Sequence, residues 1–204
     1  SMRGLDRYFN SLGDDGGCDE GPSYWFAAGA SAYDCLELYT SATTGKIDIY
    51  GDPLIKKMAS YVYKTHIADN YFVNFADADP KLTPDGLMLY RFGKAIKDET
   101  MVQFGQWAFK TFPAASTAVS GYHRPRKLNN ILSVVQLANN NFSYTPAPDA
   151  WFADIQVMTT RNASGMYLAA HGGHNAESHN HNDVGDFIIY LNGKPMIVDA
   201  GRGN

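Results

Sequence analysis

The hydrophobic pattern of this chain changes its period once, and that change limits what the chain can fold into. Before about residue 139, apolar side chains recur at helical spacing, whereas after residue 148 they form short strand-like runs. The segment 139–148 between them is polar and holds two prolines, which is typical of a linker. We therefore predict an α+β protein of two domains, residues 1–145 and residues 146–204.

The first domain is predicted to consist of amphipathic helices joined by short loops. The clearest helix follows Asp52 and Pro53, because aspartate caps a helix start and proline fits the first helical position. Apolar residues at the same spacing predict three more helices: one within residues 22–39, one that ends before Pro113, and one around residues 131–137.

The second domain is predicted to be antiparallel β-structure. Strand-like runs cover residues 151–160 and 165–171, and two further runs, 187–191 and 194–198, flank Asn192-Gly193. An Asn-Gly pair between two such runs is the strongest short-range signal for a two-residue type I′ turn. We expect this hairpin to keep a strict two-residue register.

Composition narrows the class of protein. The chain has 204 residues, of which 45% are hydrophobic and 13% aromatic, as in a globular protein. Its net charge of -4 comes from interspersed acids and bases, so no basic stripe is present and nucleic acid is not an expected partner. No run approaches the roughly 20 apolar residues of a membrane span.

Other features concern the ends and the cysteines. Ser1-Met2 looks like a cloning remnant, and Asn204 directly follows a strand-like run, so we expect a piece of a longer protein. Cys18 and Cys35 are expected to be free, buried thiols, although a disulfide in an oxidising compartment stays open. Nothing in the sequence indicates an oligomeric state.

Histidines gather near the start of the last predicted hairpin. Four of the six lie between His171 and His181, in a stretch rich in glycine and asparagine. Apolar neighbours are scarce there, and polar side chains destabilise a protein when they are buried unpaired. The cluster therefore indicates a site, in which histidine serves as a metal ligand or transfers protons near neutral pH.

This stretch resembles a known family. Residues 172–187, with Gly-Gly-His-Asn and His-Asn-His-Asn-Asp, and the Ile-Val-Asp-Ala-Gly of residues 197–201 resemble the start of the β-domain in heparinase II/III-like polysaccharide lyases. Residues 15–24 are similar to the family's Asp-Gly-x-x-x-Glu-Gly-x-x-Tyr segment, and residues 74–78 resemble a segment near the catalytic tyrosine. The resemblance implies an incomplete (α/α) toroid followed by the start of an antiparallel β-sandwich.

The resemblance also implies a reaction, the β-elimination of a uronic-acid-containing polysaccharide of the glycosaminoglycan or alginate type. The proton removed lies beside a carboxylate, so such an enzyme must neutralise that carboxylate and hold a base. By motif position, His179 assists proton transfer and Tyr71 is the catalytic tyrosine. The position of the family's carboxylate-binding His or Asn holds Gly17 or Cys18. Glu20, which matches the family's glutamate, is the expected substitute, provided that one of the two carboxyl groups carries a proton.

Further residues are candidates for contact with the sugar. Asn74 and Arg124 are the second choices for binding the carboxylate, and Arg124 suits an acidic group because its guanidinium forms paired hydrogen bonds. Tyr24 and His123 offer flat rings for sugar faces, although most aromatic residues at helical spacing belong to a core. An acidic polysaccharide or oligosaccharide is thus the expected partner, met in the periplasm or outside the cell as the resemblance implies.

A structural divalent metal, zinc or calcium, is the cofactor that the resemblance implies, and no organic cofactor is expected. By position His181 and Asp199 match two ligands, and a third would come from beyond Asn204. A strict two-residue turn raises an objection, because it pairs Asp199 with Asp186 and leaves His181 on the opposite face. Only a bulge near Gly185, or a His181 that precedes the regular strand, would remove the objection.

Two other functions stay open. His179-x-His181-x-Asp183 matches the first part of the zinc motif of metallo-β-lactamase-like hydrolases, yet Val184 stands where that motif has histidine, and the helical first domain fits that fold poorly. A non-catalytic carbohydrate-binding relative is favoured by the missing His or Asn near Gly17. Such a relative would bind sugar without forming an unsaturated product.

Overall fold

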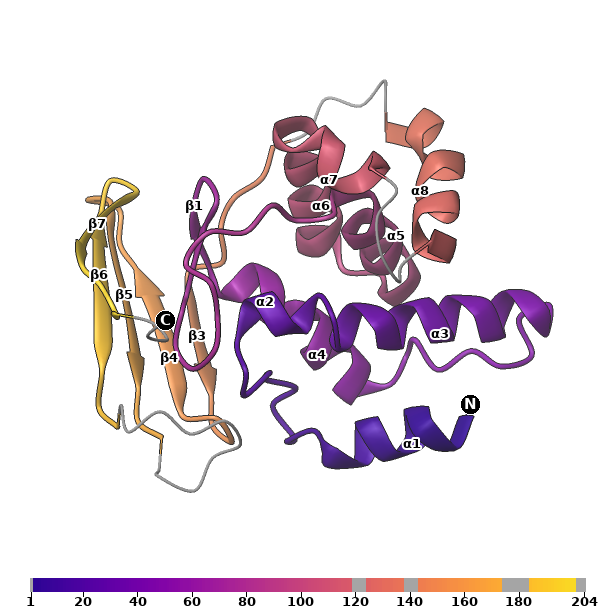
Figure 1. Ribbon diagram of the computed structural model, residues 1–204, viewed down its shortest axis with the longest axis horizontal. Helices are drawn as coiled ribbons and strands as arrows, with labels where there is room; N and C mark the ends of the chain where they lie inside the picture. The colour runs from indigo at the N-terminus through magenta and orange to yellow at the C-terminus, as the bar shows by residue number, and fades with distance from the viewer. Residues whose placement is uncertain (1, 119–123, 138–142, 174–183, 201–204) are drawn as a thin grey trace. The chain divides into compact units, whose positions relative to one another are not determined.

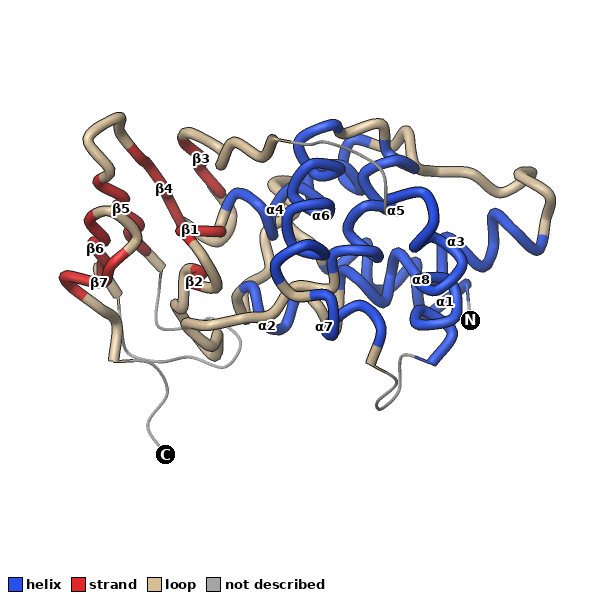
Figure 2. The backbone as a smooth tube through the Cα atoms, turned by 90° about the horizontal axis from the view of Figure 1, so that it is seen from above, coloured by secondary structure: helices blue, strands red, loops and turns tan. Residues whose placement is uncertain are grey.

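The computed structural model describes residues 2–118, 124–137, 143–173 and 184–200. In chain order the helices are α1 (Met2–Ser11), α2 (Pro22–Trp25), α3 (Gly29–Ala42), α4 (Pro53–Lys64), α5 (Gly86–Ile96), α6 (Glu99–Thr111), α7 (Pro113–Thr117) and α8 (Arg124–Leu137) (Figure 1). The strands are β1 (His66–Ala68), β2 (Tyr71–Phe72), β3 (Asp149–Phe152), β4 (Val157–Arg161), β5 (Met166–His171), β6 (Phe187–Leu191) and β7 (Lys194–Ile197) (Figure 2). The α+β class with an antiparallel sheet is confirmed. Within the described ranges, no helix has both the length and the apolar character needed to cross a bilayer.

The chain divides into two compact units. Unit 1 comprises Ser1–Gly29, Ser60–Leu82 and Pro146–Asn204, and unit 2 comprises Ala30–Ala59 and Thr83–Thr145. One boundary falls at the polar segment before the β-strands, but the helical part of the chain contributes to both units. The division into domains 1–145 and 146–204 stays a prediction.

Unit 1 holds the five-stranded sheet, in which neighbours along the chain are neighbours in the sheet, in the order β3-β4-β5-β6-β7. The β1–β2 hairpin covers part of one face: the Tyr71 and Tyr190 rings meet edge to face at 5.4 Å. This inner face is buried and is formed by Phe152, Val157, Thr159, Tyr167, Ala169, His171, Ile188 and Tyr190. The predicted single strand over residues 151–160 is wrong. A turn divides it into β3 and β4, and there Gln156 adopts a φ of 49° without being glycine.

The predicted hairpin at Asn192-Gly193 is confirmed. Both residues have positive φ, 51° and 75°, and Leu191 pairs with Lys194 across the two-residue turn. The strict register, however, is wrong, because Tyr190 pairs with Pro195 while Ile189 pairs with Ile197. Met196 is therefore an extra residue, a β-bulge that shifts every later residue of β7 by one position.

Helix α4 follows the sequence expectation. The Asp52 side chain accepts a hydrogen bond from the Leu54 amide at 2.8 Å, so Asp52 caps the helix that Pro53 begins. The helix predicted to end before Pro113 ends at Thr111 and is confirmed. The helix predicted within residues 22–39 is instead two, α2 and α3.

Unit 2 contains a pair of closely packed helices, α5 and α6. They approach through glycine: a Cβ on Gly86 would lie 2.5 Å from the Gly105 carbonyl oxygen, and a Cβ on Gly93 would lie 2.7 Å from the Val102 amide nitrogen. Around this contact Leu87, Tyr90, Val102 and Leu137 form an apolar cluster. Glycine is thus needed here for close approach rather than for an unusual backbone conformation.

Replacement of Gly105 by alanine should destabilise the protein, because the new methyl group would collide with the Tyr90 main-chain amide. Overpacking of this kind costs about 1–3 kcal/mol. Urea unfolding of the variant measures the loss. The control is Gly51→Ala, since a Cβ at Gly51 meets no atom within 4 Å. Equal stabilities of the two variants would contradict the prediction.

The helix predicted around residues 131–137 is confirmed as part of α8, and Val134 and Leu137 of its expected apolar face pack in the apolar cluster, but most of the buried side chains of α8 are polar. Ile131 and Val135 are 51% and 78% exposed, whereas Lys127 and Asn130 are buried and both donate to the Asp85 carboxylate. Two ion pairs accompany this network, Glu37–Arg91 and Asp34–Arg126. Burial raises the pKa of Glu37, but the hydrogen bond and charge of Arg91, together with hydrogen bonds from Tyr33 and Asn129, outweigh burial, and the net pKa lies below its ordinary value.

Both cysteines are free thiols. Cys18 belongs to unit 1, and its pKa is raised to about 12 by burial, with the nearby Asp19 adding to the effect. Cys35 belongs to unit 2 and is exposed, so the expectation that both thiols are buried is wrong for Cys35, and Cys18 is only partly buried.

Candidate functional site

The segment that resembles the family's Asp-Gly motif is held by reciprocal hydrogen bonds in unit 1. Asp15 accepts from the amides of Gly17 and Asp154 at 2.7 Å each, and Asp154 accepts from the Asp15 amide at 2.9 Å. These bonds tie the segment to the turn between β3 and β4. A Cβ at Gly17 would lie 2.7 Å from the end of the Ile155 side chain, so Ile155 would have to shift to admit the His or Asn that the family has there.

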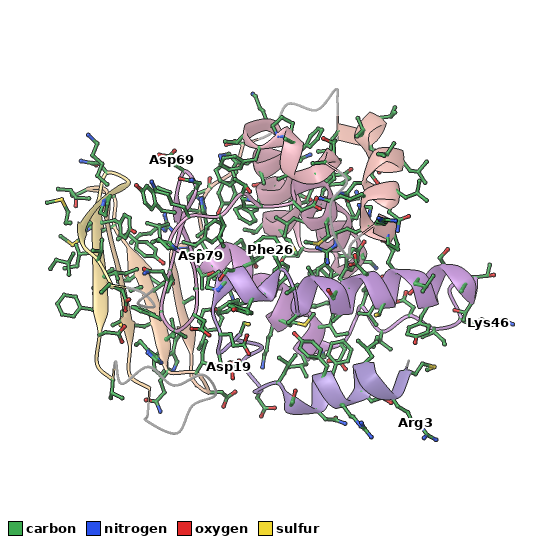
Figure 3. The ribbon with its side chains drawn as sticks, in the orientation of Figure 1. Arg3, Asp19, Phe26, Lys46, Asp69 and Asp79 are labelled. Carbon is green, nitrogen blue, oxygen red and sulfur yellow. The ribbon has the colours of Figure 1, made fainter. Side chains whose placement is uncertain are left out.

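A second segment, residues 74–78, lies against the first. Gly21 has a φ of 88°, and a Cβ on it would lie 2.5 Å from the Ala78 Cβ and 3.0 Å from the Phe75 carbonyl oxygen. This close approach explains the glycine at position 21. The Asp79 amide also donates to the Ser23 hydroxyl at 3.1 Å. Asp19 and Asp79, one from each side of this contact, are labelled in Figure 3.

A third segment reaches the same place from the sheet. His171, at the end of β5, stacks on Phe75 with ring centres 5.6 Å apart. Its Nδ1 lies 3.4 Å from a carboxylate oxygen of Asp186, and the two residues are also joined by a hydrogen bond from the His171 amide to the Asp186 carbonyl at 3.0 Å. The pair therefore joins the two ends of the histidine-rich stretch.

The point where these segments meet is closely packed. Its cavity, lined among others by Cys18, Gly21, Phe75 and His171, has a volume of about 10 Å³, which leaves room for at most one water molecule. A sugar does not fit there. The contact is thus a structural junction that positions the residues around it.

A larger pocket of about 660 Å³ lies beside this junction within unit 1. Glu20 and Tyr24 line it, as do the carboxylates of Asp19 and Asp154. No lysine, arginine or histidine of the described residues lines it. A uronate carboxylate placed here would meet like charges without a cation to compensate them.

Tyr71 lies on β2, at a different place in unit 1. It is half-buried, and besides the Tyr190 ring it contacts Lys81, whose Nζ lies 5.0 Å from the ring centre. Tyr190 itself is 2% exposed, and burial raises its pKa, with Tyr71 adding to the effect. Burial also raises the pKa of Tyr61 well above its ordinary value. Neither Tyr190 nor Tyr61 is suited to act as a base at neutral pH.

The remaining predicted site residues are distributed as follows. Asn74 is buried, and its side-chain nitrogen lies 3.4 Å from the Asp199 carbonyl oxygen, to which it donates. Arg124 begins α8 in unit 2 and is exposed. The predicted residues His123, His179 and His181 lie outside the described residues.

Asp199 is one of the two metal ligands that the resemblance implies. Continued at the register that the bulge at Met196 sets, Asp199 would face Phe187 rather than Asp186. The pairing with Asp186 from which the objection was argued is thereby removed, and His181 lies outside the described residues. Among the described residues, no three His, Cys, Asp or Glu side chains come together as a metal site.

Unit 2 has a groove of its own, about 750 Å³ in volume, between α3 and α8. Its charged side chains form the pairs Asp34–Arg126 and Glu37–Arg91, so they neutralise each other. None of the predicted site residues that the structure describes lines this groove.

Sequence reasoning missed two contacts near predicted site residues, that of Lys81 with Tyr71 and that of His171 with Asp186. His171 belongs to the histidine cluster, so its pairing with Asp186, which follows the cluster in the sequence, could have been predicted. Nothing in the sequence indicates that Lys81 lies near Tyr71, because the two residues are brought together by an isolated β-bridge.

Comparison of the sequence with protein-family models gives no match, and comparison with curated proteins gives none either. The function has to be inferred from the residues and their contacts.

Proposed function

We propose that this protein is a heparinase II/III-like polysaccharide lyase, which cleaves a uronic-acid-containing polysaccharide by β-elimination. The substrate would be of the glycosaminoglycan or alginate type and would be met in the periplasm or outside the cell. The basis is the motif resemblance together with one observation about unit 1.

That observation is the convergence of segments far apart in the sequence. The segment around Gly21 packs on Phe75 and Ala78, Phe75 stacks on His171, and Asn74 donates to Asp199. Together with the contact between His171 and Asp186, they link described residues of each stretch that carries the resemblance. A chance match of three short motifs would give no reason for them to adjoin, so the convergence supports the proposal.

The proposed reaction uses residues of this chain as acid and base. Tyr71 takes the proton from the carbon beside the carboxylate, and the electron pair of that C–H bond forms a carbon–carbon double bond. The glycosidic C–O bond on the next carbon breaks, and its oxygen takes a proton with the help of His179. The balance needs neither water nor a redox partner, and it leaves an unsaturated uronate at the new chain end.

His181 and Asp199 would hold the proposed metal ion, zinc or calcium. Support comes from their match in position to the family's ligands and from the bulge at Met196, which removes the pairing of Asp199 with Asp186. The ion would stabilise the histidine-rich stretch as a structural element.

The finer fold is also a proposal: an (α/α) toroid followed by a β-sandwich. Support for the sandwich comes from the outer face of the five-stranded sheet, which is exposed and apolar. In a sandwich, a second sheet packs on such a face. Its exposed members are Trp151, Met166, Phe187, Leu191 and Ile197.

A non-catalytic carbohydrate-binding relative is the second candidate. The observation in its favour is the acidic pocket around Glu20, where the position of the family's His or Asn is occupied by Gly17. Because no described residue brings a cation to that pocket, the family's means of neutralising the substrate carboxylate is not found there.

Absorbance of the unsaturated uronate decides between the two. The protein is incubated with a panel of acidic polysaccharides, beside a His179→Ala variant. We expect absorbance to rise on at least one polymer and the variant to abolish the rise. Binding of a polymer without any rise in absorbance would favour the non-catalytic relative.

A further inference from the structure

The elimination proposed above requires a positive group beside the substrate carboxylate, because the adjacent proton is otherwise scarcely acidic. Gly17 has no side chain to supply it, and Glu20 lines a pocket with two further carboxylates. The Asp-Gly motif therefore offers no positive group for the substrate carboxylate, whereas a lysine lies beside Tyr71.

Lys81 is held next to Tyr71 by the backbone. The two residues form an antiparallel β-bridge, flanked by hydrogen bonds from the Phe72 amide to the Pro80 carbonyl at 3.0 Å and from the Leu82 amide to the Asn70 carbonyl at 2.8 Å. The Lys81 ammonium lies 5.0 Å from the centre of the Tyr71 ring, within the range of a cation–π contact. Its position beside the phenol is therefore built into the fold of unit 1.

The charge of Lys81 is not neutralised by any residue that the structure describes. Lys81 is exposed, and no carboxylate of the described residues lies within ion-pair distance of its ammonium. Arg161 in the same unit differs, because its guanidinium donates to the His66 and Ile67 carbonyls and lies over the Tyr167 ring. Lys81 thus combines a fixed place beside Tyr71 with a charge open to an anionic ligand.

We propose that Lys81 binds the carboxylate of the uronate whose neighbouring proton Tyr71 removes. This assignment rests on the proposed lyase function. Lys81 keeps its own proton throughout and stabilises the negative charge that develops on the carboxylate as the C–H bond breaks. A substrate whose carboxyl group is methyl-esterified has no negative charge before the C–H bond breaks and only a single one afterwards, so it depends less on Lys81.

The test compares Lys81→Gln on a uronate polymer and on its methyl ester. On the free acid, kcat/KM should fall about 10²-fold, as for loss of one transition-state contact to an anion. On the ester the fall should be at most a few-fold, and Lys81→Arg should recover part of the activity on the acid. The matched control is Lys64→Gln, because Lys64 also lies over an aromatic ring, 5.9 Å from the centre of Phe152. The control should behave as the unchanged protein does.

Equal losses on acid and ester, or no loss on either, would overturn the assignment. Calorimetric binding of a uronate oligosaccharide, measured beside its methyl ester, separates this failure from failure of the lyase proposal. If the protein forms no unsaturated product, Lys81→Gln should still weaken binding of the acid about tenfold and leave the ester unchanged. Equal binding of acid and ester by the unchanged protein would exclude Lys81 as the carboxylate partner.

Discussion

Replacement of Tyr71 by phenylalanine should lower kcat on the uronate substrate by roughly 10³-fold, the middle of the range for a general acid–base group. The phenol is the proposed base, and phenylalanine retains only the ring. Because the edge-to-face contact with Tyr190 and the contact with Lys81 both involve the ring, the fold should persist. The measurement is steady-state formation of unsaturated product, with the thermal midpoint recorded beside it.

Tyr190→Phe is the matched control for this change. Tyr190 touches Tyr71 but is 2% exposed, and burial raises its pKa, so its hydroxyl stays protonated at neutral pH. Its variant should keep kcat within a few-fold of the unchanged protein. A large loss in Tyr190→Phe together with a small loss in Tyr71→Phe would show that the wrong tyrosine has been assigned.

The elements that could be predicted from sequence are those whose signals are local. Helix α4 has its own cap in Asp52 and Pro53, and the last hairpin has its own turn in Asn192-Gly193, so each was found. The turn that separates β3 from β4 was missed because Gln156 takes a positive φ that usually calls for glycine. The bulge at Met196 was missed for a related reason, since no residue type marks it.

Features that depend on distant partners could not be predicted. The buried side of α8 is largely polar because Lys127 and Asn130 donate to Asp85, more than forty residues away, and a helical periodicity based on apolar residues carries no signal for such a contact. The contacts of the candidate site also depend on segments that are separate in the sequence. Its motifs were visible in the sequence, but the pairing of Lys81 with Tyr71 and the acidity of the pocket around Glu20 depend on contacts between segments.

His66 should make the protein lose stability as the pH falls from about 6.5 to about 4. The side chain is 2% exposed, and burial lowers its pKa from 6.5 to about 4, although a hydrogen bond to the Asp69 carbonyl partly opposes this and the nearby Arg161 adds to it. Between these two pH values the unfolded chain holds a proton on His66 and the native protein does not. Unfolding therefore takes up a proton, and the free energy of unfolding decreases as the pH falls.

The size of this effect follows from the two pKa values. A decrease from 6.5 to about 4 corresponds to about 3 kcal/mol of unfolding free energy, fully present above pH 6.5 and lost by pH 4. Glu37 affects the free energy of unfolding in a different pH range, because its lowered pKa changes stability only below its ordinary value of 4.5. Urea unfolding at pH 7, 6, 5 and 4.5 should accordingly show a steady loss, and a His66→Gln variant should show a much flatter curve over the same interval. If both proteins lose stability equally between pH 6.5 and 4.5, the loss arises from other groups and His66 is not the residue that makes the native state sensitive to acid.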